Sequence, residues 1–151
     1  MINFYGLAFI VAIMIPNIIF AVTHRDGFEN NYKNKIVETL EQVGRFGCFI
    51  FEILQVPALC RGYLSPAGKT VYCALGAGLV FFYCLFWVIF RKESSMRKAV
   101  LLSVLPSLLF AESGILTRNF PLIAMAAVFS VCHIKISVEN AKFIKNKGEK
   151  E

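Results

Sequence analysis

Four polar side chains that could do chemistry lie in strongly apolar surroundings: Arg45, Glu52, Gln55 and Glu112. Arg45 and Glu52 are seven residues apart, close to two turns of an α-helix, and Gln55 follows at one more turn, so we expect the three on one side of a helix. A charged side chain at the centre of a bilayer costs about 2.5–3.5 kcal/mol on insertion scales. We therefore interpret the four as a candidate intramembrane polar site that faces protein or trapped water.

The two acids of this candidate site, Glu52 and Glu112, are expected on different helices. Two carboxyls that meet between helices could share a proton or bind a cation. The alternative is structural: Glu52 could be a neutral or paired group that locks helix packing, and Glu112 could lie close to the membrane surface. The sequence leaves both roles open.

Familiar enzyme and metal motifs are absent from the sequence. It contains no Walker loop, His-Glu-x-x-His, Gly-x-Ser-x-Gly or EF-hand pattern. The five cysteines form no Cys-x-x-Cys pair, and no His and Cys residues have the spacing of a zinc site. We predict no catalytic residues, no metal and no cofactor, which favours a non-enzymatic protein. A lipid-modifying membrane enzyme that uses His24 or His133 is the alternative.

The composition indicates a membrane protein. Hydrophobic residues make up 57% of the chain and charged residues 17%, with a mean hydropathy of +0.62. Soluble domains have about 25% charged residues, and a soluble core of this size could not bury so much apolar surface. The net charge of +6 collects in short connections between apolar runs, which is typical of a membrane protein and argues against nucleic acid as a partner.

The predicted fold class is all-α: an integral membrane helix bundle with about five transmembrane helices and short amphipathic interfacial helices. A single transmembrane domain is expected over residues 1–145, followed by a flexible cytoplasmic tail at 146–151. One interfacial helix is expected from Tyr32 to Val43 and another after the fifth span. The expected spans are residues 4–22, 43–60, 70–90, 99–116 and 120–136.

Small residues predict the surfaces where helices approach one another. Gly44, Gly47 and Cys48 form one such surface on the second span. Ala74 and Gly78 form a small-x-x-x-small surface on the third.

The distribution of basic residues predicts the orientation. Lys and Arg are frequent in the first and third connections and in the tail, and sparse in the second and fourth connections. Since cytoplasmic loops carry the excess of basic residues, five spans with the N-terminus outside and the C-terminus inside fit every connection. The expected location is a bacterial cytoplasmic membrane.

The run Leu40–Gly47 (LEQVGRFG), with Ile15-Pro16-Asn17 before it, resembles small uncharacterised multi-pass membrane proteins of low-GC Gram-positive bacteria. The resemblance implies a membrane location and supplies no catalytic residues. We therefore expect a non-enzymatic membrane component, either an accessory subunit or a small transporter-like oligomer. The alternative is a proton- or cation-coupled transporter that uses Glu52 and Glu112. The expected partners are the lipid bilayer and either further copies of the chain or a larger membrane complex.

Overall fold

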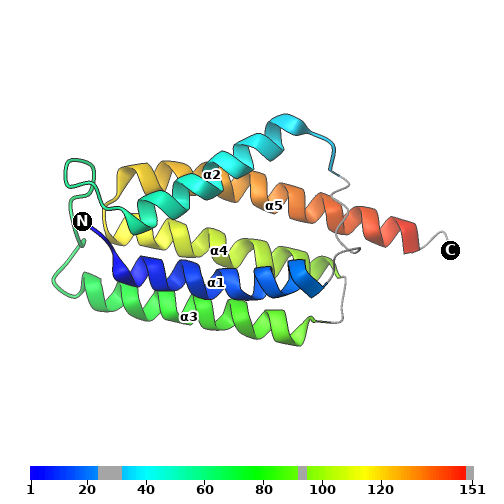
Figure 1. Cartoon of the computed structure of the whole chain (residues 1–151), viewed down its shortest axis with the longest axis horizontal. Coiled ribbons are helices and arrows are strands. Elements are labelled where there is room, and N and C mark those ends of the chain that lie inside the picture. Colours follow the sequence, from blue (N-terminus) through cyan, green and yellow to red (C-terminus); the bar gives the residue numbers. More distant parts are fainter. Residues whose placement is uncertain (24–31, 92–94, 149–151) are drawn as a thin grey trace.

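The part of the chain that the structure describes folds into helices, which confirms that the chain is all-α as predicted. The computed structural model describes residues 1–23, 32–91 and 95–148. Figure 1 shows the helices lying along one another as a bundle. In chain order they are α1 (Phe4–Thr23), α2 (Lys35–Ile53), α3 (Gly68–Ile89), α4 (Met96–Leu116) and α5 (Phe120–Gly148).

Aromatic contacts show the relative direction of α1 and α3. Phe9, near the start of α1, packs on Tyr72, near the start of α3, with ring centroids 5.5 Å apart. Phe20 and Trp87, near the ends of the same helices, have ring centroids 5.1 Å apart. The two helices therefore run in the same direction, and α2, which lies between them in the chain, runs back (Figure 1).

The bundle has two different ends. We call the end that holds the N-terminus and the connection 54–67 the cap end (Figure 1). We call the opposite end, where α5 projects past the other helices, the tail end. Both α2 and α4 finish at the cap end, whereas α1 and α3 begin there.

Four helices are long and apolar enough to cross a membrane, by length and composition: α1, α3, α4 and residues Phe120–Phe143 of α5. Large apolar side chains cover their outer surfaces; Val11, Phe81 and Val131 are 52%, 62% and 70% exposed. So much apolar surface would be costly in water and is expected against lipid. These are the properties of a multi-pass membrane protein in contact with a bilayer.

The helix α2 differs from the expected second span of residues 43–60. It begins at Lys35, where the Asn34 side chain accepts hydrogen bonds from the backbone N–H groups of Ile36 and Val37, and it ends at Ile53. The expected interfacial helix is therefore the first half of the same helix. Leu54 is extended and pairs with Ile2 in a single β-bridge, so the chain leaves the helix earlier than its hydropathy predicts.

The charged residues of α2 explain why it is not among the four apolar helices. Their side chains interrupt the hydropathy of the helix but concentrate on one side of it. Glu41 and Glu52 are buried together with Gly44 and Cys48, at helical spacings of three and four residues. The opposite side exposes apolar residues such as Phe46, which is 58% exposed.

The last helix is longer than predicted. The expected span of residues 120–136 and the short helix after it form one continuous helix, α5, which extends to Gly148. The flexible tail predicted for 146–151 is thus helical as far as Gly148, and residues 149–151 lie outside the described residues. Asn140 on this extension is buried and accepts a hydrogen bond from the Tyr32 backbone N–H at 3.1 Å, so the extension packs on the segment before α2.

Side chains of the turn between α4 and α5 hold the cap end together. Arg118 has φ +49° and its guanidinium donates hydrogen bonds to the carbonyls of Arg61, Gly62 and Tyr63. Asn119 donates to the Phe51 carbonyl at 2.8 Å and accepts from the Leu122 N–H at the start of α5. These bonds fix the connection 54–67 over the ends of α2 and α4.

Candidate functional site

A buried hydrogen-bond chain surrounds Glu52 at the cap end. Glu52 is 1% exposed and Tyr72 is fully buried. The Tyr72 hydroxyl donates to Glu52 Oε1 at 2.8 Å, and it accepts a hydrogen bond from the Asn3 side-chain amide at 2.9 Å. These hydrogen bonds join Asn3, which directly precedes α1, to Tyr72 of α3 and Glu52 of α2. Three segments distant in sequence therefore meet at one carboxyl.

The other carboxyl oxygen of Glu52 has a different environment. Oε2 is buried and has no hydrogen-bond partner among the described residues. A buried carboxyl oxygen without a partner is costly, because the oxygen has lost its hydration without replacement. Buried polar atoms in folded proteins nearly always have a partner, so this oxygen is a position where a further group could bind.

Glu112 on α4 provides a second carboxyl with the same character. Its Oε2 accepts a hydrogen bond from the Ser113 hydroxyl at 3.2 Å, while its Oε1 is buried without a partner among the described residues. The Ser113 hydroxyl also lies beside the Glu52 carboxyl, and the charge of Glu52 acts on Glu112. The structure therefore brings Glu52 and Glu112 together.

The neighbourhood of this pair contains no compensating positive charge in the described part of the chain. The ion pairs found there use Glu41 and Glu139 instead. The basic residues of the cap end have other contacts: Lys69 lies over the Tyr5 ring at 5.1 Å, and Arg61 lies over the Phe120 ring at 5.7 Å. Glu52 and Glu112 are thus two neighbouring acids, of which Glu52 is buried and Glu112 is half-buried.

The structure does not bring Arg45 and Gln55 to the same site. Arg45 lies nearer the tail end and pairs with Glu41, four residues before it, rather than with Glu52. Gln55 lies beyond the end of α2, so it shares no helical face with Glu52. Its backbone carbonyl accepts a hydrogen bond from the Met1 amino group at 2.8 Å, and this contact helps to hold the N-terminus at the cap end.

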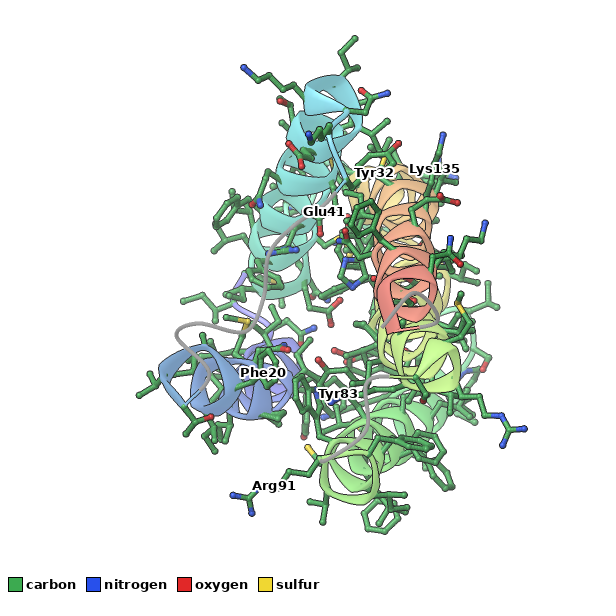
Figure 2. All side chains as sticks on the ribbon, turned by 90° about the vertical axis from the view of Figure 1, so that its right-hand side faces the viewer. Phe20, Tyr32, Glu41, Tyr83, Arg91 and Lys135 are labelled. Carbon is green, nitrogen blue, oxygen red and sulfur yellow. The ribbon has the colours of Figure 1, made fainter. Side chains whose placement is uncertain are left out.

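Arg45 belongs to a separate polar cluster of Glu41, Arg45 and His133 between α2 and α5. Glu41 is 3% exposed, and its Oε1 accepts from Arg45 Nε at 3.1 Å and also from the terminal Nη2. His133 Nδ1 lies 2.9 Å from the same oxygen, and its ring stacks on Phe129 with centroids 4.6 Å apart. Figure 2, seen from the tail end, shows Glu41 pointing into the space between α2 and α5.

The glycines of α2 lie at the contact with α5. A Cβ atom on Gly44 would come within 2.8 Å of the Phe129 backbone nitrogen, and one on Gly47 within 2.6 Å of the Met125 side chain. Cys48, on the same side of the helix, is fully buried. These residues let α2 approach α5 closely enough to bury its charged face.

The predicted small residues of α3, unlike the glycines of α2, do not contact another helix of the described chain. Ala74 is exposed, and a Cβ on Gly78 would have no atom within 4 Å. It is Gly76 that meets another helix of the chain, because a Cβ there would lie 2.4 Å from the Phe9 ring. A packing role for Ala74 and Gly78 therefore stays a prediction about contacts beyond this chain.

Sequence reasoning missed Asn3, Tyr72, Ser113 and Glu41. Tyr72 reads in the sequence as a residue of the interfacial aromatic belt, and its burial depends on contacts with α1 and α2 that no local pattern encodes. Glu41 had a detectable signal, since it lies four residues before Arg45 on one helical face.

His24, a candidate for lipid chemistry, lies outside the described residues. The described residues contain no cluster of three His, Cys, Asp or Glu side chains suited to a metal ion.

Comparisons with known proteins add no relative: no family model, no curated protein and no solved structure matches this chain.

Proposed function

We propose that α2 is a fifth membrane crossing. The support is topological: α1 and α3 run in the same direction, so the chain between them has to return through the full thickness of the bundle. With 19 residues and a rise of 1.5 Å per residue, α2 is about 28 Å long, close to the roughly 30 Å of a bilayer's hydrocarbon core. Its charges are tolerable at that depth because Glu41 and Glu52 face protein rather than lipid.

The proposed orientation has the cap end outside and the tail end in the cytoplasm of a bacterial cell. Basic residues support it, because cytoplasmic segments carry the excess of Lys and Arg. The tail end gathers them from two connections and from the second half of α5. Those in the described residues are Lys33, Lys35, Arg91, Arg97, Lys98, Lys135, Lys142, Lys145 and Lys147, against Arg61, Lys69 and Arg118 at the cap end.

Within this topology, the function supported best is that of a small, non-enzymatic transporter coupled to a proton or cation. One observation carries the proposal: Glu52 and Glu112 are close together, each has one buried oxygen without a partner, and neither has a basic neighbour in the described chain. An acidic pair held inside a membrane bundle is the usual means of carrying protons or cations. A purely structural carboxyl would be expected to have both oxygens satisfied.

Glu52→Gln is expected to abolish pH-driven flux. The amide keeps the shape of the carboxyl but cannot release a proton or carry a negative charge. The measurement is the decay of an imposed pH difference in proteoliposomes that contain a pH-sensitive dye. Glu139→Gln is the matched control, because Glu139 is 44% exposed in its side chain and pairs with Lys142 at the tail end. Undiminished flux through Glu52→Gln, or no flux through the unaltered protein, would contradict the transport proposal.

The second candidate function is that of an accessory subunit in a homo-oligomer or a larger membrane complex. The observation that favours it is the surface of α3 at Ala74 and Gly78, two small residues four apart: Ala74 is exposed, and a Cβ on Gly78 would meet no described atom within 4 Å. Small residues at this spacing let helices of separate chains approach closely in membranes.

Gly78→Leu tests the second candidate by assembly rather than by flux. The free space around Gly78 predicts that the monomer folds normally, while a leucine there would keep a partner helix at a distance. Native mass spectrometry from a mild detergent should show the unaltered protein with a second subunit and the variant without it. A single unaccompanied chain in both samples would rule this candidate out.

A further inference from the structure

We propose that residues 1–3 form a strap that closes the Glu52 site toward the cap end, and that Asn3 links this strap to the carboxyl. Such a strap controls access to Glu52 whether or not the site carries an ion, so it goes beyond the proposed function.

Glu52 lies close to one end of the bundle although it is buried. It is the second-last residue of α2, which ends at Ile53, and its partner Tyr72 is the fifth residue of α3. With a rise of 1.5 Å per residue, both residues lie within about 6 Å of the cap-end limits of their helices. The shortest path from water to the carboxyl therefore leads through the cap end, and the segments that cover this end keep Glu52 buried.

The strap lies against the end of α2 as a short antiparallel strand. Its centre is the β-bridge between Ile2 and Leu54. Two backbone hydrogen bonds flank the bridge: Asn3 N–H to the Ile53 carbonyl at 2.8 Å, and Gln55 N–H to the Met1 carbonyl at 2.9 Å. Since residue 53 directly follows Glu52, this pairing begins beside the site.

Asn3 continues from this pairing into the site. Its side-chain amide donates to the Tyr72 hydroxyl, which in turn donates to Glu52. A Cβ on Gly6, in the first turn of α1, would come within 2.7 Å of Glu52 Oε1 and 2.8 Å of the Asn3 amide nitrogen. The start of α1 therefore lies directly on the carboxyl. Asn3 and Glu52 are both buried while the rest of the strap is exposed, so Asn3 separates the carboxyl from the surface of the cap end.

The cap end has a second cover, the connection 54–67, which is held more firmly (Figure 1). Arg118 donates three hydrogen bonds to its carbonyls, and Tyr63 of the connection packs on Tyr72 with ring centroids 6.0 Å apart. The strap, by contrast, has an exposed Ile2 side chain that adds little apolar burial. Segments with few buried apolar contacts open at the lowest cost in free energy. The strap is therefore the part of the cap end that is expected to open first.

Opening of the strap changes the site as well as the path to it. When Asn3 leaves, the Tyr72 hydroxyl loses the hydrogen bond from its amide. Water that enters can then satisfy Glu52 Oε2, which has no partner among the described residues in the closed form. Hydration removes the cost of a buried polar atom without a partner. The position of the strap and the environment of Glu52 are thereby linked.

The test is carboxyl labelling of the purified protein in mild detergent, with a water-soluble carbodiimide and a small amine, read out by mass spectrometry. Gln55→Pro weakens the strap because proline has no N–H to donate to the Met1 carbonyl. Glu52 in this variant is expected to react about two- to tenfold faster than in the unaltered protein, the range that one lost hydrogen bond gives. The exposed Glu139 is the internal reference and should react equally in both proteins.

A second variant locks the strap instead of weakening it. Ile2 and Leu54 face each other at a non-hydrogen-bonded position of the antiparallel pair, where Cα atoms lie about 4.5 Å apart and a disulfide can form. In the double variant Ile2→Cys with Leu54→Cys, oxidation should lower the labelling of Glu52 below that of the unaltered protein, and reduction should restore it. The unaltered protein, oxidised in the same way, controls for its own free cysteines.

Equal labelling of Glu52 in the weakened, locked and unaltered proteins would overturn the proposal, as would faster labelling after the strap is locked. Flux measured on the same proteins separates the strap from transport. Labelling that follows the strap in a protein without any flux would support the strap and end the transport proposal. Flux that depends on Glu52, with labelling that is indifferent to the strap, would do the reverse.

Discussion

Gly44→Leu should prevent α2 from docking on α5 and leave little folded protein. The nearest atoms to an added Cβ belong to the backbone of Phe129, at 2.8 Å for the nitrogen and 2.9 Å for Cα. Backbone atoms in a packed helix cannot turn aside as a flexible side chain can. Overpacking a core costs about 1–3 kcal/mol where side chains can adjust, so a larger loss is expected where only movement of a whole helix relieves the clash.

The measurement is the amount of monodisperse protein recovered in detergent and the temperature at which half of it is lost. Gly78→Leu is the matched control, because it makes the same change at a position with no atom within 4 Å. Equal stability of the two variants would show that α2 does not lie against α5 as described.

Glu41→Ala should cause the second large loss of stability, by about 2–3 kcal/mol. Glu41 is 3% exposed and is hydrogen-bonded to both Arg45 and His133, so its removal leaves two polar partners at the contact between α2 and α5. Breaking a buried ion pair from one side costs about 3–5 kcal/mol. The expected value is lower because the Arg45 side chain is 36% exposed and regains some hydration.

Unfolding in mixed micelles of mild detergent and dodecyl sulfate provides the measurement. The exposed pair of Glu139 and Lys142 on α5 provides the control, and Glu139→Ala should change the free energy of unfolding by less than about 1 kcal/mol. Arg45→Ala should cost less than Glu41→Ala, because Glu41 keeps its contact with His133. If Glu41→Ala lowers the free energy of unfolding no more than the control does, Glu41, Arg45 and His133 do not form a buried cluster.

The long apolar helices could be predicted from the sequence because lipid exposure leaves a strong local signal. The expected spans 70–90 and 99–116 differ by at most three residues from the ends of α3 and α4. The helix in the region of the second span differs from the expected bounds at both ends, for two physical reasons. It begins earlier because it continues through Glu41, whose buried carboxyl lies against His133 of α5, and it stops at Ile53 because Leu54 pairs with Ile2.

The candidate site could be predicted only in part. Burial of Glu52 could be predicted from the sequence alone, because a charged side chain exposed to lipid is costly. Its partner Tyr72 is 20 residues away in the sequence, and Asn3, which donates to Tyr72, is 49 residues away, so no local spacing indicates that they meet. Gln55 was assigned to the same helical face because the helix was expected to continue past Ile53, and Arg45 was expected near Glu52 although Glu41 is the closer acid on the same face.

The chain has a single tryptophan, and its position makes it a built-in optical probe of one half of the bundle. Trp87 lies against Phe20 of α1, and the Lys98 ammonium of α4 lies 5.2 Å from its ring. Its indole emission therefore reports the junction of α1, α3 and α4 at the tail end. Detachment of α2 from α5 alone would leave that emission nearly constant, whereas loss of the whole bundle would change it. A label on α2 would report detachment of that helix, and Trp87 emission would report unfolding of the remaining bundle. The two signals together can thus distinguish partial opening from complete unfolding.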